Sequence, residues 1–236
     1  MANQLDQLVE KLRKALDVRL VSVVLYGSAA TGDHVEKVSD YNVLCILTKI
    51  SPDELRAVEP VFGWWREQGN PSPLLMTEHE LETSTDCFAI EFHDIREHHR
   101  ILHGPNLVAS LEIDQSFYRA QVESQLRTKL LRLRQKGGGV LSDNDALRGL
   151  LVDSVSTFCV LFRHARLLDG ATGPTLKRDI IEIAGKHFGI ETASFLTLLD
   201  LREEKVKAKE VEPEPLFARY IIQIEKVIDA VDVIAK

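Results

Sequence analysis

Two short apolar runs, separated by a polar segment, constrain the fold of this chain more than any other feature. The runs are Val21–Tyr26 and Val43–Leu47; each is rich in Val, Leu or Ile and is bounded by turn residues. Such runs predict buried β-strands. Between them stand Gly27-Ser28, a polar loop, and Ser39-Asp40-Tyr41-Asn42. The chain is therefore expected to form a small sheet whose first two strands are joined by a polar connection.

The polar residues at the strand ends suggest a chemistry. A strand that ends in Gly27-Ser28 lets backbone N–H groups approach a phosphate closely. Asp40 and Asn42 are two positions apart at the start of the second strand, so their side chains project from one face. Mg²⁺ prefers hard oxygen ligands and shares them with substrate phosphates. The arrangement suits a metal-bound nucleoside triphosphate.

A further strand, with polar residues on one of its sides, is expected at Phe88–His93. Alternation places Phe88, Ile90 and Phe92 on a covered side and Glu91 on the open side. Asp94 follows at the strand end, where the face that it takes stays open. Glu91 is therefore the first candidate for a third acidic group beside Asp40, and Asp94 is the second.

The remaining pattern predicts an α/β domain followed by a helical one. Ser51 and Glu54 form a capping box before a helix that reaches Gln68. From Asp114 onward the spacing is helical, and Gly137-Gly138-Gly139 is expected to end the first of five helices. The predicted fold class is α/β: a small mixed sheet with helices on one face, then an all-helical antiparallel bundle. The domains are expected at residues 1–108 and 109–236, and the other predicted elements are helices 3–15, 146–168, 175–187, 192–206 and 216–235, a strand at 73–77 and a helical turn at 78–83.

The motif of Gly27-Ser28, eleven intervening residues and Asp40-x-Asn42 resembles the signature of the DNA polymerase beta-type nucleotidyltransferase superfamily. The subgroup that it resembles is the small-molecule and minimal nucleotidyltransferases, such as the kanamycin nucleotidyltransferase type. The resemblance implies Mg²⁺-dependent transfer, with Mn²⁺ as an alternative metal, of a nucleoside monophosphate from a nucleoside triphosphate such as ATP. The acceptor would be a hydroxyl of a small molecule, such as an aminoglycoside, or of a protein. The helical domain would bind the acceptor or form a homodimer.

The resemblance also implies roles for individual residues. Gly27, Ser28 and Asn42 would bind the nucleotide, with Ser28 and nearby N–H groups holding the β- and γ-phosphates. Asp40, Asn42 and Glu91 would hold the metal. Asp40 and Glu91 would be catalytic, and Glu91 either completes the metal site or acts as the general base.

Asn42 departs from the superfamily pattern, which has a second carboxylate at this position. An amide offers one neutral carbonyl oxygen and is a weaker Mg²⁺ ligand than a carboxylate. Two functional interpretations follow. The protein is either an enzyme with a weakened metal site or a catalytically degenerate nucleotide-binding regulator or complex partner.

Charge and composition restrict the remaining function classes. The net charge of −7 argues against a general nucleic-acid binder. The cysteines Cys45, Cys87 and Cys159 are widely spaced in apolar contexts, which is typical of buried free thiols in the cytoplasm. Neither a signal segment nor a run long enough to cross a membrane is visible in the sequence.

Two groups of charged or titratable residues are interpreted conservatively. The spacing of His93, His98, His99 and His103 fits no zinc pattern. The basic residues of the first bundle helix and of the following one are assigned to solvated faces in preference to phosphate contacts. They are Arg127, Lys129, Arg132, Arg134, Lys136, Arg163, His164 and Arg166.

Overall fold

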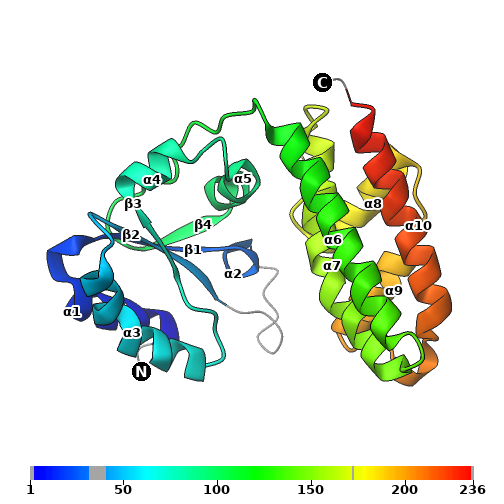
Figure 1. Cartoon of the computed structure of the whole chain (residues 1–236), viewed down its shortest axis with the longest axis horizontal. Coiled ribbons are helices and arrows are strands. Elements are labelled where there is room, and N and C mark those ends of the chain that lie inside the picture. The colour runs from blue at the N-terminus through cyan, green and yellow to red at the C-terminus, as the bar shows by residue number, and fades with distance from the viewer. Residues whose placement is uncertain (1–2, 32–40, 172, 235–236) are drawn as a thin grey trace. The chain divides into compact units, whose positions relative to one another are not determined.

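The computed structural model describes residues 3–31, 41–171 and 173–234. The chain divides into two compact units, Met1–Gln115 and Ser116–Lys236. The first unit combines a sheet with helices, and the second is helical (Figure 1). Residues 109–115, assigned to the second domain from the sequence, lie in the first unit. Arg96 donates a hydrogen bond to the Leu111 carbonyl (3.1 Å), and the Gln115 amide contacts the His93 ring (2.8 Å).

The sheet of the first unit has four strands in the order β3-β2-β1-β4. β1 (Leu20–Tyr26) pairs antiparallel with β2 (Asn42–Leu47) and with β4 (His99–His103). β3 (Leu74–Thr77) extends the sheet beside β2 in parallel. The sheet is mixed, as the sequence predicts, and β1 lies in its interior with a neighbour on each side.

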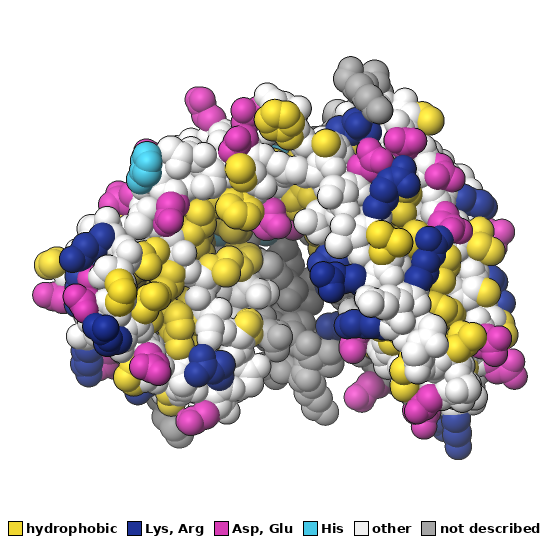
Figure 2. Space-filling model, viewed as in Figure 1, with side chains coloured by type: hydrophobic (Ala, Val, Ile, Leu, Met, Phe, Trp, Pro, Cys, Tyr) yellow, Lys and Arg dark blue, Asp and Glu magenta, His cyan; other side chains and the backbone are white. Residues whose placement is uncertain are grey.

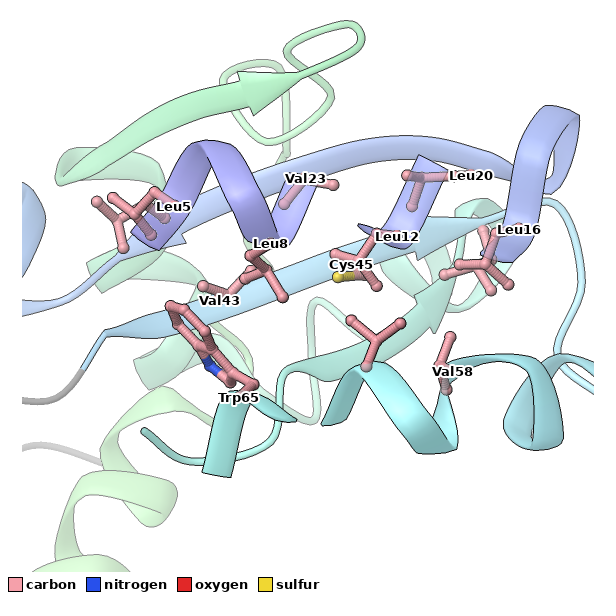
Figure 3. Close-up of a cluster of buried hydrophobic side chains, with 13 residues drawn as sticks. Leu5, Leu8, Leu12, Leu16, Leu20, Val23, Val43, Cys45, Val58 and Trp65 are labelled. Carbon is pink, nitrogen blue, oxygen red and sulfur yellow. The ribbon is translucent and has the colours of Figure 1, made fainter. Parts of the chain in front are cut away.

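One face of the sheet, called the first face below, is covered by α1 (Gln4–Leu16) and α3 (Pro52–Glu67). Figure 3 shows Leu8, Val43 and Trp65 packed together in this layer. Both helices begin with the capping box that their sequences encode, at Asn3–Asp6 and Ser51–Glu54. The apolar stripe of α1 is buried at helical spacing, at Leu5, Leu8, Leu12 and Leu16.

The opposite face, the second face, is covered by α4 (Glu78–Thr83), α5 (Ala89–Glu97) and the segment at 108–111. The prediction of helices on one face only was therefore incomplete. The physical reason lies in the strands, whose apolar runs lack strict alternation. Val24, Leu44 and Ile46 point away from the first face and need a second apolar cover. Leu81, Phe92 and Ile95 supply it.

The predicted strand at Phe88–His93 was wrong, because these residues begin helix α5. Ala89, expected on the open side of a strand, is fully buried. Burial of Ala89, Phe92 and Ile95 follows the spacing of a helix and not that of a strand. The fourth strand lies further along the chain, at β4.

The second unit contains five α-helices in its described residues. They bury a continuous apolar core that includes Val122, Leu151, Phe158, Phe195 and Tyr220. The fold class is thereby confirmed: a small mixed α/β sheet followed by an all-helical unit. The helices are α6 (Tyr118–Val140), α7 (Asn144–Leu167), α8 (Lys177–Phe188), α9 (Ala193–Arg202) and α10 (Pro213–Asp232).

Helix α6 does not end at the three glycines, which corrects the sequence prediction. It continues through Gly137, Gly138 and Gly139 to Val140. A Cβ at Gly137 would lie 2.4 Å from Cζ of Phe217 on α10. The glycine therefore allows the Phe217 ring to pack directly against the α6 backbone. Tertiary packing outweighs the weak helix propensity of glycine.

The cysteines are all free, and one of them differs from expectation. Cys45 and Cys159 are buried, whereas Cys87 is exposed. Burial raises the pKa of the Cys45 thiol to about 12, so this side chain behaves as a small apolar group of the first face.

Candidate active site at the end of β1

The Gly27-Ser28 turn connects β1 directly to the short helix α2 (Ser28–Thr31) (Figure 1). Gly27 has a φ of +78°, and the N–H of Ala30 donates to its carbonyl at 2.9 Å. A Cβ at Gly27 would lie 3.2 Å from Nδ2 of Asn42. Glycine is thus needed twice, for a left-handed backbone and for the close approach of Asn42. The structure brings the turn and Asn42 together, as the sequence motif implies.

Three polar side chains form a row across the sheet beside this turn. Tyr26, the last residue of β1, pairs with Asn42 on β2 and with His99 on β4. Residues directly opposite one another on antiparallel strands project from the same face. Tyr26 packs with the apolar cluster of the second face, so the row Asn42–Tyr26–His99 lies on that face. All three are half-buried, so the row is accessible at the sheet end.

Helix α5 places Glu91 near this row. Burial raises the pKa of the Tyr26 hydroxyl, and the negative charge of Glu91 raises it further. Glu91 is exposed, whereas the next residue, Phe92, is buried in the second face and anchors the helix. Asp94 follows one turn later and is half-buried. The two acidic candidates therefore share one side of α5.

Two residues of the predicted site fall wholly or partly outside the description. Asp40 lies outside the described residues, and for Ser28 only the backbone is described, as the first residue of α2. The described residues contain no group of three or more His, Cys, Asp or Glu side chains able to hold a metal. Near the turn they supply the Asn42 amide, and the Glu91 carboxylate acts electrostatically on Tyr26, the residue before the turn. These are hard oxygen donors suited to a Mg²⁺ shared with substrate phosphates, but two of them do not make a metal site alone.

The sequence motif does not include Tyr26 and His99, which the structure adds to the candidate site. Asn106 fixes the tautomer of His99. The Ala109 N–H donates to Oδ1 of Asn106 (3.2 Å). The other amide atom of Asn106, Nδ2, then donates to Nε2 of His99 (2.9 Å). The His99 Nδ1–H then donates to the Arg96 carbonyl (3.2 Å). Both ring nitrogens are engaged in hydrogen bonds, which suits a fixed part of the wall.

Two of the basic residues of α6, Arg127 and Arg134, take part in ion pairs within the bundle. Figure 2 shows Lys and Arg side chains interspersed with Asp and Glu over the second unit. Arg127 contacts Glu123 at 2.7 Å and Asp232 at 3.7 Å, and Arg134 pairs with Glu225. Such pairs are typical of a solvated helix face.

The interpretation of Arg163, His164 and Arg166 as solvated was wrong. All three are buried on α7. The Tyr118 hydroxyl and Nδ1 of His164 are 2.6 Å apart. Helical spacing alone gave no indication of this, because a long central helix of a bundle is covered on several sides.

Comparisons with known proteins give a fold and no close relative. No family model matches the chain, and no curated protein matches it. Among solved structures, a crystal structure of a spectinomycin adenyltransferase from Enterococcus faecialis with ATP and spectinomycin matches with a TM-score of 0.60. The match covers 94% of this chain and 98% of that one.

The chain has the nucleotidyltransferase fold. The match extends over both units, so the likeness is not confined to the sheet. At 11% sequence identity it shows the fold alone. In this nucleotidyltransferase-fold protein, the Gly27 turn and Asn42 lie together at one end of β1, and the charge of Glu91 acts on Tyr26 at that end. In the described part of the chain, no helix is both long enough and apolar enough to span a membrane.

Proposed function

We propose that this protein is a Mg²⁺-dependent nucleotidyltransferase that transfers a nucleoside monophosphate from a nucleoside triphosphate to a hydroxyl of a small molecule. The observation that supports the proposal is the close approach of Asn42 to the Gly27 turn at the end of β1, with the charge of Glu91 acting on the neighbouring Tyr26, in a nucleotidyltransferase fold. A glycine turn offers N–H groups to phosphate oxygens, and a neighbouring carboxylate offers a base.

The residues are given the following tasks. The Gly27-Ser28 turn binds the β- and γ-phosphates. Asp40, proposed from the sequence alone, joins Asn42 as an oxygen ligand for Mg²⁺ or Mn²⁺, and Glu91 either completes this metal site or serves as the general base. When bound, the metal neutralises charge on the phosphates. In the Asn42 amide, Nδ2 is the atom nearest to a Cβ built at Gly27. The amide oxygen Oδ1 lies on the other side and is the proposed metal ligand.

The chemical step needs one base. The acceptor hydroxyl oxygen forms a bond to the α-phosphorus as the bond from that phosphorus to the bridging oxygen of pyrophosphate breaks. Glu91 takes the hydroxyl proton, and pyrophosphate leaves. The negative charge of Glu91 acts on Tyr26, so we give the Tyr26 hydroxyl the task of orienting this carboxylate.

The acceptor is proposed to be a cationic small molecule, such as an aminoglycoside, because the site residues Asp40 and Glu91 are acidic. The matched adenyltransferase was crystallised with spectinomycin, which is consistent with this class of acceptor. We further propose that the second unit binds the acceptor or forms a homodimer, and that the protein acts in the cytoplasm.

A second function is favoured by Asn42, because an amide stands where the superfamily pattern has a second carboxylate. In this alternative the protein binds a nucleotide without turnover and acts as a regulator or a partner in a complex. The two functions differ in one observable, the release of pyrophosphate.

The first experiment is calorimetric titration with ATP and GTP, with and without Mg²⁺ or Mn²⁺. The proposal predicts metal-dependent binding that is lost in Asp40→Ala and retained in Asp153→Ala, a matched control at an exposed acid on α7. Absence of nucleotide binding would overturn both functions. Pyrophosphate release across a panel of aminoglycoside acceptors then separates the enzyme from the regulator.

A second variant tests Asn42 itself. If its amide oxygen contributes to the metal site, Asn42→Asp adds a negative charge there and raises the affinity for Mg²⁺. An unchanged Mg²⁺ affinity in the same titration would remove Asn42 from the metal site.

A further inference from the structure

The second unit contains an open cavity remote in sequence from the candidate active site. Its volume is about 710 Å³, and it lies between the first half of α7, the end of α9 and the connector that includes the short helix Ala208–Glu210. Cavities that bind small ligands typically have volumes of about 300–1,000 Å³. All of its lining residues belong to the second unit.

The interior of the cavity is largely apolar. Val152 on α7, Leu201 on α9 and Val206 in the connector line it. Gly149 lies on the α7 wall, and a Cβ built there would meet no atom within 4 Å. The wall from α7 therefore leaves space for an apolar body to lie against the helix.

The polar lining favours an anion. It comprises three cationic side chains, Arg148, Lys207 and Lys209, and two anionic ones, Asp145 and Glu204. This excess of positive charge stands out in a chain with a net charge of −7. Both lysines are exposed, so they can reach the head group of a ligand at the entrance.

Arg148 carries an additional signal. Its side chain is only 11% exposed; it donates to Asp145 at 2.6 Å and to the Val211 carbonyl at 3.2 Å. Its Nε is buried and has no hydrogen-bond partner among the described residues. Because this atom has no accessible surface, a ligand in the cavity would meet the remaining exposed part of the Arg148 side chain, whose positive charge the two hydrogen bonds hold in place beside the cavity.

We propose that this cavity binds a small amphiphile that has an apolar body and a single anionic oxygen group, such as a medium-chain carboxylate. The apolar body lies against Gly149, Val152 and Leu201. The anionic group faces Arg148 and the two lysines. This site is independent of the proposed nucleotidyl transfer.

The test uses the full chain and anilinonaphthalenesulfonate, a fluorescent probe with an apolar body and one sulfonate. The expected result is saturable binding that octanoate displaces and octylamine does not. Gly149→Phe fills the cavity and abolishes this binding. Gly139→Phe is the matched control, because Gly139 is also helical and a Cβ there also meets no atom within 4 Å.

Circular dichroism spectra of both variants establish that they are folded. Retained binding in folded Gly149→Phe, equal loss in Gly139→Phe, or absence of saturable binding would each overturn the proposal. The role of the positive charges is tested with a double variant that combines Lys207→Glu and Lys209→Glu. This double variant should weaken octanoate binding about fivefold and leave octanol binding unchanged, since exposed charges contribute modestly. Equal effects on octanoate and octanol would also contradict the proposal.

Discussion

The two faces of the sheet are built from alternate residues of the same strands, and they differ in how far they are covered. On the first face, Val23 and Leu25 of β1 and Cys45 of β2 are all buried under α1 and α3. These helices have 13 and 16 residues. On the second face, α4 and α5 have only 6 and 9 residues.

The shorter cover on the second face explains where the candidate site lies. Val24 and Leu44 are buried there, but Tyr26 and Asn42 at the strand ends are half-buried and polar. Because side chains alternate along a strand, one run of residues serves both a sealed core and an accessible site. The comparison indicates that the first face contributes stability and that the end of the second face offers accessible polar groups for the proposed chemistry.

The largest effect on stability is expected from opening the first face. Trp65 is fully buried there, so Trp65→Ala should lower the free energy of unfolding by about 3–5 kcal/mol. Trp64 is half-buried and lies 4.9 Å from the Lys11 ammonium, so Trp64→Ala should cost about 1 kcal/mol. Urea unfolding followed by fluorescence of the remaining tryptophan measures both. Similar losses in the two variants would contradict the assignment of Trp65 to the core.

At the end of the second face, a substitution is expected to change catalysis and to leave the stability of the protein unchanged. Glu91→Gln should reduce pyrophosphate release by about 100-fold to 10,000-fold, as expected for loss of a general base. Because the charge of Glu91 raises the pKa of Tyr26, the variant should also lower that pKa, while burial still keeps it above the ordinary value. Ultraviolet titration, with Tyr26→Phe to identify the signal, reports this shift.

The control for this variant is Glu59→Gln, which removes an exposed carboxylate from α3 on the first face. It should change neither transfer nor the Tyr26 titration. An unaltered Tyr26 titration in Glu91→Gln would separate Glu91 from the row and leave Asp94 as the acidic candidate.

A smaller effect on stability is expected at the Gly27 turn, which follows β1. Gly27→Ala places a side chain at a φ of +78° and a Cβ at 3.2 Å from Nδ2 of Asn42. It should destabilise the protein by about 1–2 kcal/mol and weaken nucleotide binding. Gly69→Ala, at a φ of +87° with no atom near the Cβ, carries the backbone strain without the contact. Loss of nucleotide affinity in both variants would show that displacement of Asn42 is not the cause.

A further effect is a pH dependence on the first face. The Ser51 hydroxyl, together with Arg19 and Lys49, lowers the pKa of Glu54 to about 2 from an ordinary value of 4.5. A carboxyl group whose pKa falls on folding stabilises the protein above its unfolded pKa and loses that contribution as the pH drops. The difference in melting temperature between the protein and Glu54→Gln should be full above pH 4.5 and shrink towards pH 2. A pH-independent difference would contradict the assignment.

Local signals in the sequence predicted the first face well. Ser51, Pro52 and Glu54 define the start of α3, and the leucines of α1 define its buried side. The same reasoning failed at α5, because a short segment with apolar residues at alternate positions fits a strand and a helix equally well. It failed again at Gly137, where contact with a residue distant in the sequence decides the conformation.

The candidate site could be predicted only in part, because some of its residues are brought together by contacts between distant segments of the chain. The Gly27-Ser28 motif and Asn42 were visible as a spacing along the chain. Tyr26 and His99 were not, because their role depends on strand pairing between residues 73 positions apart. The roles of Asp40 and Ser28 stay predictions from the sequence.

The sequence by itself determined the strands β1, β2 and β3, the capped helices and the turn, because caps, periodicity and glycine act over a few neighbouring residues. Only the tertiary structure decided which helices cover the second face, why α6 continues through three glycines, and which polar side chains meet at the end of β1. Those outcomes depend on contacts between segments far apart in the chain. Their energies come from packing and burial, which no local pattern records.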